Sequence, residues 1–274
     1  MSKSSAIIAR LRAHASPTVQ LRAASGDSPS RLGGSPDLPG GFEWPRSPQG
    51  NLAFVAQLDL AHLNGDGRVE YLPREGRVLL FYDARESADG SRPGDRAHWR
   101  VVYIEPAAIP TLRRAALPAD LPREFLDYRE ISVAPYPIAT TPREWRLDPP
   151  VDPGTLSDDD CEALDRFALE PYGGLPRHQL GGHPFPESSD TMDFDCQIVS
   201  NGIALEDAER REDPKIVAVF EDAPRWRLLL QLDSDPLGGM SWGQRGLLYV
   251  WVPEESARDG RFGDAWVMVQ SELD

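Results

Sequence analysis

The feature that most constrains this chain is a set of motifs that occurs twice in the same order. Leu32–Pro36 has the sequence LGGSP, and Leu180–Pro184 has the sequence LGGHP. Each motif precedes an apolar run that ends in Gln-Leu-Asp, at Gln57–Asp59 and at Gln231–Asp233. Repetition in a fixed order predicts an internal duplication, in which one structural unit occurs twice.

Two more elements follow each Gln-Leu-Asp triplet. A glycine precedes a β-rich run, and a run that begins with tryptophan comes last. The matching pairs are Gly76 with Gly246, Val78–Tyr82 with Leu247–Val252, and Trp99–Tyr103 with Trp266–Val269. The spacing differs mainly after the first motif, so residues 185–225 hold an insertion in the second half.

These short apolar runs, bounded by turn residues, are typical of buried strands. One unit has too few strands to bury its own face. We therefore predict an α+β fold, rich in β structure and internally duplicated, in which two related β-sheet units pack together with a few flanking helices. Residues 1–105 would hold an N-terminal helix and the first repeat, 106–156 a packed Pro-rich connector, and 157–274 a helix and the second repeat. We expect the two repeats to form one compact unit.

The connector carries ten prolines between Pro106 and Pro153, which predicts that no long helix or central strand forms there. After it, Ser157 can cap a helix whose first turn is acidic. The inner face of that helix is expected to contain Cys161, Leu164, Phe167 and Ala168.

The N-terminal segment, residues 1–26, is basic and contains no acidic residue. Such a segment can mimic an organellar transit peptide. We favour an amphipathic helix with Ile7, Ile8 and Leu11 on one face. Nothing in the chain approaches the ~20 apolar residues of a membrane span. We therefore expect a cytoplasmic protein that does not bind membranes.

The chain is strongly acidic, with a formal net charge of −15 from 29 basic and 44 acidic residues. This charge disfavours nucleic-acid binding, because phosphate backbones are repelled. It favours solubility and attracts basic partners. The two cysteines, Cys161 and Cys196, form neither a disulfide framework nor a zinc motif, and both are expected to be buried and inert.

Several ordered motifs resemble those of the YwqG-like family, a bacterial domain of unknown function. The matching segments are Leu32–Pro36, Trp44–Pro45, Ala56–Leu60, Cys196–Gly202, Gln231–Asp235, Trp242–Gly243 and Gly246–Tyr249. The resemblance covers residues 18–270. It implies an α+β fold with a duplication, and it favours a helix for residues 190–201, whose apolar pattern fits both helix and strand. It implies no reaction, because no catalytic residues are known for the family.

Four residues are candidates for ligand binding: Asp59, Asp233, Asp235 and Trp242. Two carboxylates two residues apart could bind a hard cation, although the family often has Trp-Gly-Asp where this chain has Trp242–Gln244. The alternative is that the aspartates cap turns after buried strands. Trp242 is either a core residue or an exposed anchor for a partner. We predict no metal site and no cofactor.

The two glutamines of the repeated triplets, Gln57 and Gln231, occupy equivalent places. Their repetition predicts a shared structural role, such as amide hydrogen bonds that tie the two halves together. A functional cleft between the halves is the less favoured alternative.

No catalytic motif stands out, since GxGxxG, GxxxxGK[ST], HExxH and GxSxG are all absent. We therefore expect a non-enzymatic intracellular binding protein whose acidic surface engages a basic protein partner, as an immunity protein engages a toxin. The alternative is an enzyme, or a small-ligand or metal-binding protein, with a site between the two repeats. The sequence does not decide whether the protein has catalytic activity, nor its oligomeric state.

Overall fold

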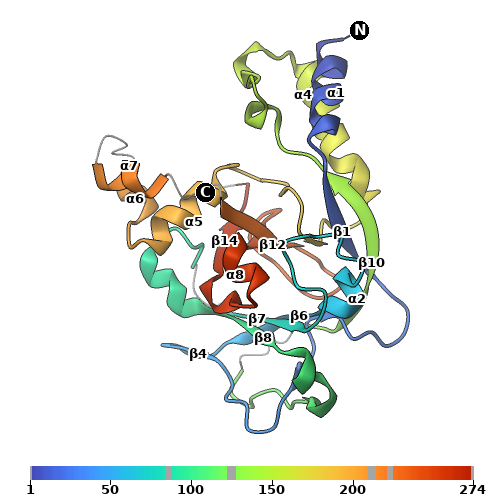
Figure 1. The fold of residues 1–274 in the computed structure, drawn as a ribbon, viewed down its shortest axis with the longest axis vertical. Helices are drawn as coiled ribbons and strands as arrows, with labels where there is room; N and C mark the ends of the chain where they lie inside the picture. The colour runs from blue at the N-terminus through green and yellow to red at the C-terminus, as the bar shows by residue number, and fades with distance from the viewer. Residues whose placement is uncertain (1, 84–87, 122–127, 209–213, 221–224, 273–274) are drawn as a thin grey trace.

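The computed structural model describes residues 2–83, 88–121, 128–208, 214–220 and 225–272. Within these residues, a ten-stranded antiparallel sheet has the strand order β14-β13-β12-β11-β1-β10-β2-β6-β7-β8. The sheet curls until it is nearly closed, and several helices lie around it (Figure 1).

The elements of the described part of the chain have the following bounds. The strands of the large sheet are β1 (Ser16–Ala23), β2 (Arg31–Leu32), β6 (Ala53–Asp59), β7 (Arg77–Tyr82), β8 (Trp99–Ile104), β10 (Ile131–Thr140), β11 (Gln179–Leu180), β12 (Trp226–Asp233), β13 (Leu247–Pro253) and β14 (Trp266–Gln270). Two small pairs are β3 (Asp37–Leu38) with β9 (Arg113–Arg114), and β4 (Arg46–Ser47) with β5 (Gly50–Asn51). The α-helices are α1 (Lys3–Ala13), α2 (Leu60–Asn64), α4 (Asp158–Leu169), α5 (Met192–Ser200), α6 (Leu205–Ala208), α7 (Pro214–Phe220) and α8 (Glu254–Arg258). The 3-10 helices are η1 (Pro93–His98), η2 (Pro106–Thr111), η3 (Glu144–Arg146), η4 (Pro153–Thr155), η5 (Glu170–Tyr172) and η7 (Phe262–Asp264).

The central pair of the sheet, β1 and β10, separates two sides that we call the first side (β2, β6, β7, β8) and the second side (β11, β12, β13, β14). The next strand of the large sheet after each Gly-Gly motif has a bulge, between Phe54 and Ala56 in β6 and between Leu228 and Leu230 in β12. The backbone N–H of a motif glycine donates to the bulged residue on both sides, from Gly33 to Val55 at 2.8 Å and from Gly181 to Leu229 at 3.1 Å. The two sides thus share their strand succession and the place of the bulge.

Only glycine fits at Gly33. Its φ is +64°, and a Cβ there would lie 2.4 Å from the carbonyl oxygen of Arg129. Gly181 has a φ of +69°, and a Cβ would meet the Val69 side chain at 2.6 Å. Positive φ without steric penalty is the property that glycine supplies, which explains the motif at both places.

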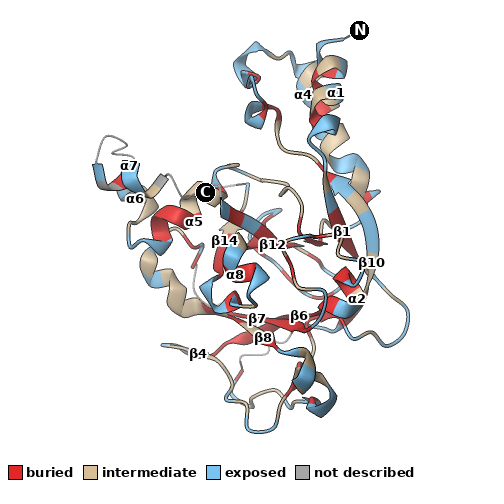
Figure 2. Ribbon diagram, in the orientation of Figure 1, coloured by how far each residue is buried: buried red, intermediate tan, exposed pale blue. Residues whose placement is uncertain are grey.

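The outer strands of the two sides come together where the sheet nearly closes. The rings of Trp99 in β8 and Trp266 in β14 pack edge to face, with centroids 5.0 Å apart. The indole N–H of Trp99 donates to the Ala265 carbonyl at 3.2 Å. Buried side chains from both sides form one large apolar cluster, and the buried segments lie mainly in the strands (Figure 2).

The connector differs from its prediction, because β10 is a ten-residue strand in the middle of the sheet order that contains Pro135 and Pro137. β10 pairs with β2 only at Ile131 and Ser132, whereas it pairs with β1 along most of its length. The two prolines therefore have a strand neighbour on one side only, where proline is tolerated as in an edge strand.

Three helix predictions have mixed outcomes. The N-terminal helix is confirmed as α1, with Ile7 and Leu11 buried. Residues 192–200 form the helix α5 that the family resemblance favoured. Ser157 caps α4 as expected, but Leu164 is the one buried residue of that helix. The prediction that Cys161 is buried is wrong, because it lies on the outer face of α4.

The helices α1 and α4 pack on each other and project from the sheet (Figure 1). Together with residues 147–156 they form what we call the α1–α4 lobe. Its own apolar cluster contains Ile7, Leu11, Leu147 and Leu164. The lobe is therefore held by contacts separate from those of the sheet interior.

Candidate functional site

The repeated glutamines hold the loops that precede their strands. Gln57 donates its amide N–H to Pro29 O at 2.9 Å and accepts from the backbone N–H of Asp37 at 2.8 Å. Gln231 donates to Arg177 O at 2.8 Å and accepts from the backbone N–H of Phe185 at 2.7 Å. The shared structural role is confirmed. The expected tie between the halves is wrong, because these hydrogen bonds stay within one side of the sheet.

Replacing either glutamine by leucine should lower the free energy of unfolding by about 2–4 kcal/mol, because two buried backbone groups lose their partners. Gln57→Leu and Gln231→Leu are compared with Gln244→Leu, an exposed position expected to change stability by less than ~0.5 kcal/mol. Urea titrations measure all three. A Gln57 or Gln231 variant as stable as the Gln244 variant would contradict the assigned role.

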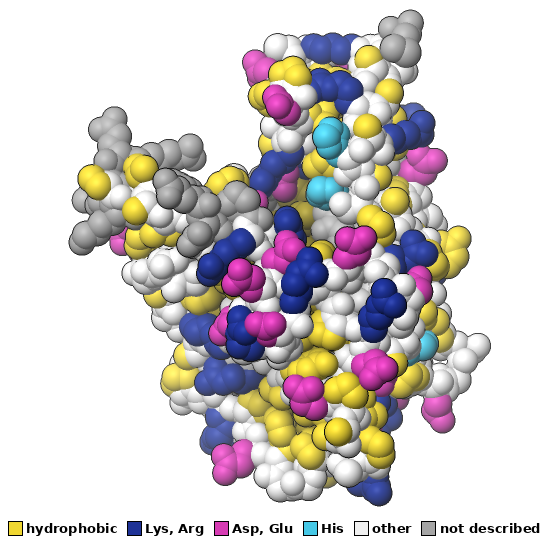
Figure 3. Space-filling model, viewed as in Figure 1, with side chains coloured by type: hydrophobic (Ala, Val, Ile, Leu, Met, Phe, Trp, Pro, Cys, Tyr) yellow, Lys and Arg dark blue, Asp and Glu magenta, His cyan; other side chains and the backbone are white. Residues whose placement is uncertain are grey.

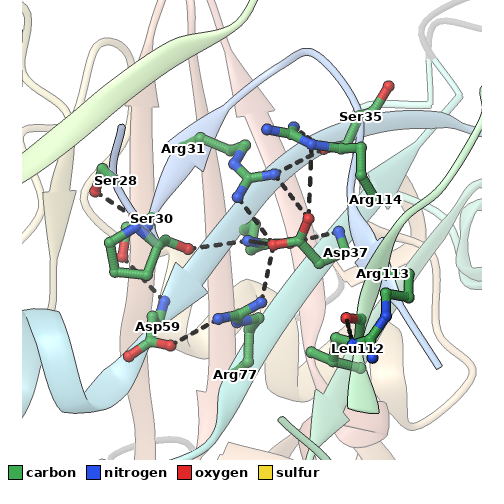
Figure 4. A network of polar contacts seen from close by, with 12 residues as sticks. Ser28, Ser30, Arg31, Ser35, Asp37, Asp59, Arg77, Leu112, Arg113 and Arg114 are labelled. Atoms are coloured by element: carbon green, nitrogen blue, oxygen red, sulfur yellow. Dashed lines mark hydrogen bonds and ion pairs between the residues drawn. The ribbon is translucent and has the colours of Figure 1, made fainter. Parts of the chain in front are cut away.

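The first candidate, Asp59, belongs to a buried ion network on the first side (Figure 4). Asp59 caps α2 by accepting from the backbone N–H of His62 at 3.1 Å, and it accepts from Arg77 at 2.9 Å. Arg77 and Arg31 both donate to Asp37, at 3.0 and 2.9 Å. Asp59 therefore caps the helix that follows its strand and forms an ion pair with Arg77. This is the structural role that the turn-capping alternative predicts.

Asp37 is the centre of this network. Burial alone would raise the pKa of Asp37, but hydrogen bonds from Arg31 and Gln57 hold it below its usual value. Arg114 adds a third guanidinium, 3.6 Å from the same carboxylate. Within the described part of the chain, the Nε atoms of Arg31 and Arg77 are buried without a hydrogen-bond partner. Asp37 is thus kept ionised by its arginines.

Asp233 and Asp235 lie in a second polar cluster at the end of β12. Asp233 accepts from the Nε and Nη2 atoms of Arg177 at 2.9 and 3.1 Å. Asp235 accepts from the backbone N–H of Leu237 at 2.8 Å and lies 3.3 Å from His178 Nε2. The hydrogen bond with His178 is the main cause that lowers the pKa of Asp235. Both carboxylates are occupied by groups of the protein itself.

Trp242 lies beside this second cluster and is 5% exposed. Its indole N–H donates to Asp233 O at 3.2 Å, and its ring packs against Tyr82 and Tyr128 with centroids 5.9 Å away. The structure therefore brings Trp242 and Asp233 together. Asp59 belongs to the other network, and no described contact joins it to them.

Among the described residues, no group of three or more His, Cys, Asp and Glu side chains is placed to hold a metal ion. No described helix combines the length and apolar character needed to cross a membrane.

A pocket of about 710 Å³ lies between the two sides of the sheet. We call it the inter-side pocket. Residues 68–71, which follow α2, line the pocket from the first side. Parts of β12, β13 and α8 line it from the second side. Its lining residues are His14, Ser16, Pro17, Arg68, Val69, Glu70, Tyr71, Pro142, Arg146, Gly182, His183, Pro184, Asp190, Asp193, Trp226, Arg227, Leu228, Trp251, Glu254 and Arg258.

Among the titratable groups that line the pocket, Asp190 and His183 have pKa values that burial shifts in opposite directions. Burial raises the pKa of Asp190 to about 6, although Arg146 lies 3.2 Å away and opposes the shift. Burial lowers the pKa of His183 to about 4. His183 Nε2 lies 3.0 Å from Ser16 Oγ, a distance that suits a nucleophile and its base. Nε2 also lies 3.1 Å from the carbonyl oxygen of His14, which can only accept a hydrogen bond. Nε2 therefore carries the proton in this contact and does not act as a base toward Ser16 there.

Sequence reasoning missed this pocket because its residues come from distant segments. One signal was available: His183 occupies the LGGHP motif, where the first repeat has Ser35. The imidazole of His183 therefore marks a position at which the two repeated turns differ. Asp190 and Arg146 carry no comparable pattern.

Because the folded-state pKa of Asp190 lies above that of an unfolded aspartate, protonation should stabilise the fold. This contribution is present below pH ~4 and is lost as the pH rises through 6. Relative to Asp190→Asn, the free energy of unfolding of the wild type should therefore increase by about 2 kcal/mol from pH 7 to pH 4. Denaturant titrations at both pH values measure it. A constant difference between the two proteins would contradict the shift.

A comparison with known families gives the affiliation of the chain. Residues 30–271 match the model of a domain of unknown function, DUF1963, and so include both Gln-Leu-Asp triplets and every lining segment of the inter-side pocket beyond residue 17. No curated protein matches the sequence. Since the match spans most of its length, the chain belongs to the DUF1963 family.

Proposed function

We propose that the protein is a non-enzymatic binding protein that engages a basic protein partner through the acidic face of the α1–α4 lobe. Neutralising a toxin, as immunity proteins do, is one form that this function can take. The proposal includes the cytoplasmic location expected from the sequence.

The observation that carries the proposal is the charge of residues 148–170. This segment has eight acidic residues and one basic residue, Arg166. The acidic residues are Asp148, Asp152, Asp158, Asp159, Asp160, Glu162, Asp165 and Glu170, and all but Asp160 are exposed. Such a concentrated negative surface attracts cationic partners and accelerates their association.

Apolar side chains lie beside this acidic face. Leu169, at the end of α4, is 43% exposed, and Leu175 is 46% exposed. A pocket of about 400 Å³ at the same end of α4 is lined in part by Phe167, Ala168 and Ile138. Interfaces combine apolar anchors with a charged rim, so this surface suits a basic partner with an apolar side chain at its centre.

The test compares three tagged proteins in affinity capture from the source cell: wild type, a lobe variant and a control. The lobe variant is Asp158→Asn, Asp159→Asn and Glu162→Gln. The control removes three exposed acidic groups elsewhere, by Asp27→Asn, Glu43→Gln and Glu105→Gln, and so has the same net charge. We expect wild type and control to retain the same basic protein, in a salt-sensitive manner, and the lobe variant to lose it. Recovery of no basic protein, or equal recovery by the lobe variant, overturns the proposal.

We also infer that the two sides of the sheet descend from one duplicated module. We further infer that, within the DUF1963 family, this chain is related to the YwqG-like proteins. Matching hydrogen bonds support the duplication. The backbone N–H of Asp59 donates to Ser30 Oγ at 3.0 Å, and that of Asp233 donates to His178 Nδ1 at 3.1 Å. In both cases the acceptor precedes the short strand that pairs with the Gln-Leu-Asp strand.

A further inference from the structure

The pocket of about 400 Å³ lies where the α1–α4 lobe meets the sheet, and we call it the lobe pocket. Its walls come from the junction of α1 and β1, from β10, from the end of α4 with η5, and from the turn after β11. Figure 1 shows α1 and α4 side by side above β1 and β10. Its volume falls within the range of small-molecule sites, ~300–1,000 Å³.

Most of the lining of the lobe pocket is apolar and accessible. Nine of its fourteen residues are Ala, Ile, Phe, Pro or Tyr. Ile138, Phe167, Ala168 and Phe185 are half-buried, and Ile138 and Phe185 belong to none of the apolar clusters of the described residues. Their apolar surface is therefore not used by the protein interior and is available to the apolar part of a ligand.

Hydrogen bonds fix the walls of the lobe pocket in place. The backbone N–H of Phe185 donates to Gln231 Oε1 at 2.7 Å, and its carbonyl accepts from the Tyr249 hydroxyl at 2.7 Å. On the opposite strand, Thr140 Oγ1 accepts from the backbone N–H of His183 at 2.8 Å. A site that is formed before binding costs less free energy of ordering when the ligand enters.

The charges of the lining select the head group of a ligand. Arg143 is compensated, because Asp165 lies 3.0 Å from its Nη2 atom. The guanidinium of Arg12 lies 5.3 Å from the centroid of the Phe167 ring, and no carboxylate of the described residues forms an ion pair with it. Acidic and basic side chains interleave over much of the face drawn in Figure 3, whereas Arg12 has no such neighbour and is available to an anionic group. Glu170 is the one acidic residue of the lining, against two arginines, so the formal charge of the lining is positive.

We propose that the lobe pocket binds a small apolar monocarboxylate. The apolar body of the ligand packs on the accessible lining, and its carboxylate contacts the exposed guanidinium of Arg12, whose planar fork matches a carboxylate. A cationic ligand would bring its charge beside Arg12, and a neutral ligand would leave the guanidinium without a partner. This proposal does not rest on the basic protein partner, because Leu169 does not line the pocket and Glu170 is the one acidic residue of 148–170 that does.

The experiment uses the full-length protein and saturation-transfer NMR, with each probe at millimolar concentration, where weak binding is detectable. Octanoate and decanoate carry an aliphatic body, and 3-phenylpropanoate carries an aromatic one. Octanamide and octylamine are the neutral and cationic analogues of octanoate, and acetate has the charge without the body. We expect at least one of the three apolar acids to bind, octanamide to bind about threefold more weakly than octanoate, octylamine more weakly still, and acetate not at all.

Variants place the binding in the lobe pocket. Ala168→Gln extends a longer side chain into it and should weaken binding about tenfold or more, whereas Ala9→Gln makes the same change at an exposed position of α1 and should not. Arg12→Gln should weaken binding about threefold, as expected for an exposed ion pair, whereas Arg166→Gln removes an exposed arginine that does not line the pocket. Glu170→Gln should strengthen binding up to about twofold.

Circular dichroism checks that each variant is folded. The proposal is overturned if the wild type binds none of the three apolar acids, if octylamine binds as tightly as octanoate, or if the Ala168 or the Arg12 variant binds like its control.

Discussion

Replacing Arg77 by alanine is expected to lower the free energy of unfolding by about 3–5 kcal/mol. Arg77 is buried, and its guanidinium contacts Asp59 at 2.9 Å and Asp37 at 3.0 Å. Removing it leaves Asp59 as a buried carboxylate whose hydrogen bond to a cation is lost, and the cost of burying an uncompensated charge is large. Urea titration followed by circular dichroism measures the change.

Arg261→Ala is the matched control, since Arg261 is about half exposed and pairs with Asp259 and Asp264 at the surface. Exposed pairs contribute about 0–1 kcal/mol. If Arg77→Ala and Arg261→Ala have the same stability, the buried network does not hold the first side in the way proposed.

Replacing Trp99 by alanine should also cost about 3–5 kcal/mol, the range for deleting a large buried aromatic side chain. Trp99 is fully buried and joins the outer strands of the two sides through its packing on Trp266 and its hydrogen bond to Ala265. The variant therefore loses apolar burial and the contact that nearly closes the sheet.

Trp145→Ala serves as the comparison, because Trp145 is 36% exposed and should cost less than ~1 kcal/mol. Thermal unfolding and urea titration measure both variants. A Trp99 variant no less stable than the Trp145 variant would show that the outer strands do not depend on each other.

Much of the fold could be predicted from local pattern, because alternation of apolar runs with turn residues records which segments are buried. The strands β6, β7, β12 and β13 fall where the repeated runs predicted them. The sequence did not predict the strand β10, because it contains two prolines. They are tolerated because β2 pairs with the first residues of β10 alone and does not reach the prolines. That tolerance depends on a tertiary neighbour and leaves no trace in the segment itself.

The candidate site was harder to predict for a similar reason. Asp233 and Trp242 come together because a short turn region links them, and this proximity is visible in the sequence. The partner of Asp233 is Arg177, which lies 56 residues away, and the aromatic and charged lining of the inter-side pocket comes from several segments. A carboxylate at the end of a strand looks like a candidate ligand in the sequence, even when an arginine from a distant segment pairs with it in the fold. The sequence pattern does not separate these two cases.

Both sides of the sheet are expected to form one body with a shared interior. Native-state hydrogen exchange measured by mass spectrometry tests it most directly. Amides of β6 and β7 and those of β12 and β13 should exchange with the same free energy of opening, and denaturant should lower both in parallel. Exchange of β12 and β13 at a clearly lower free energy, while β6 and β7 stay protected, would show two separately folding units and would contradict the claim.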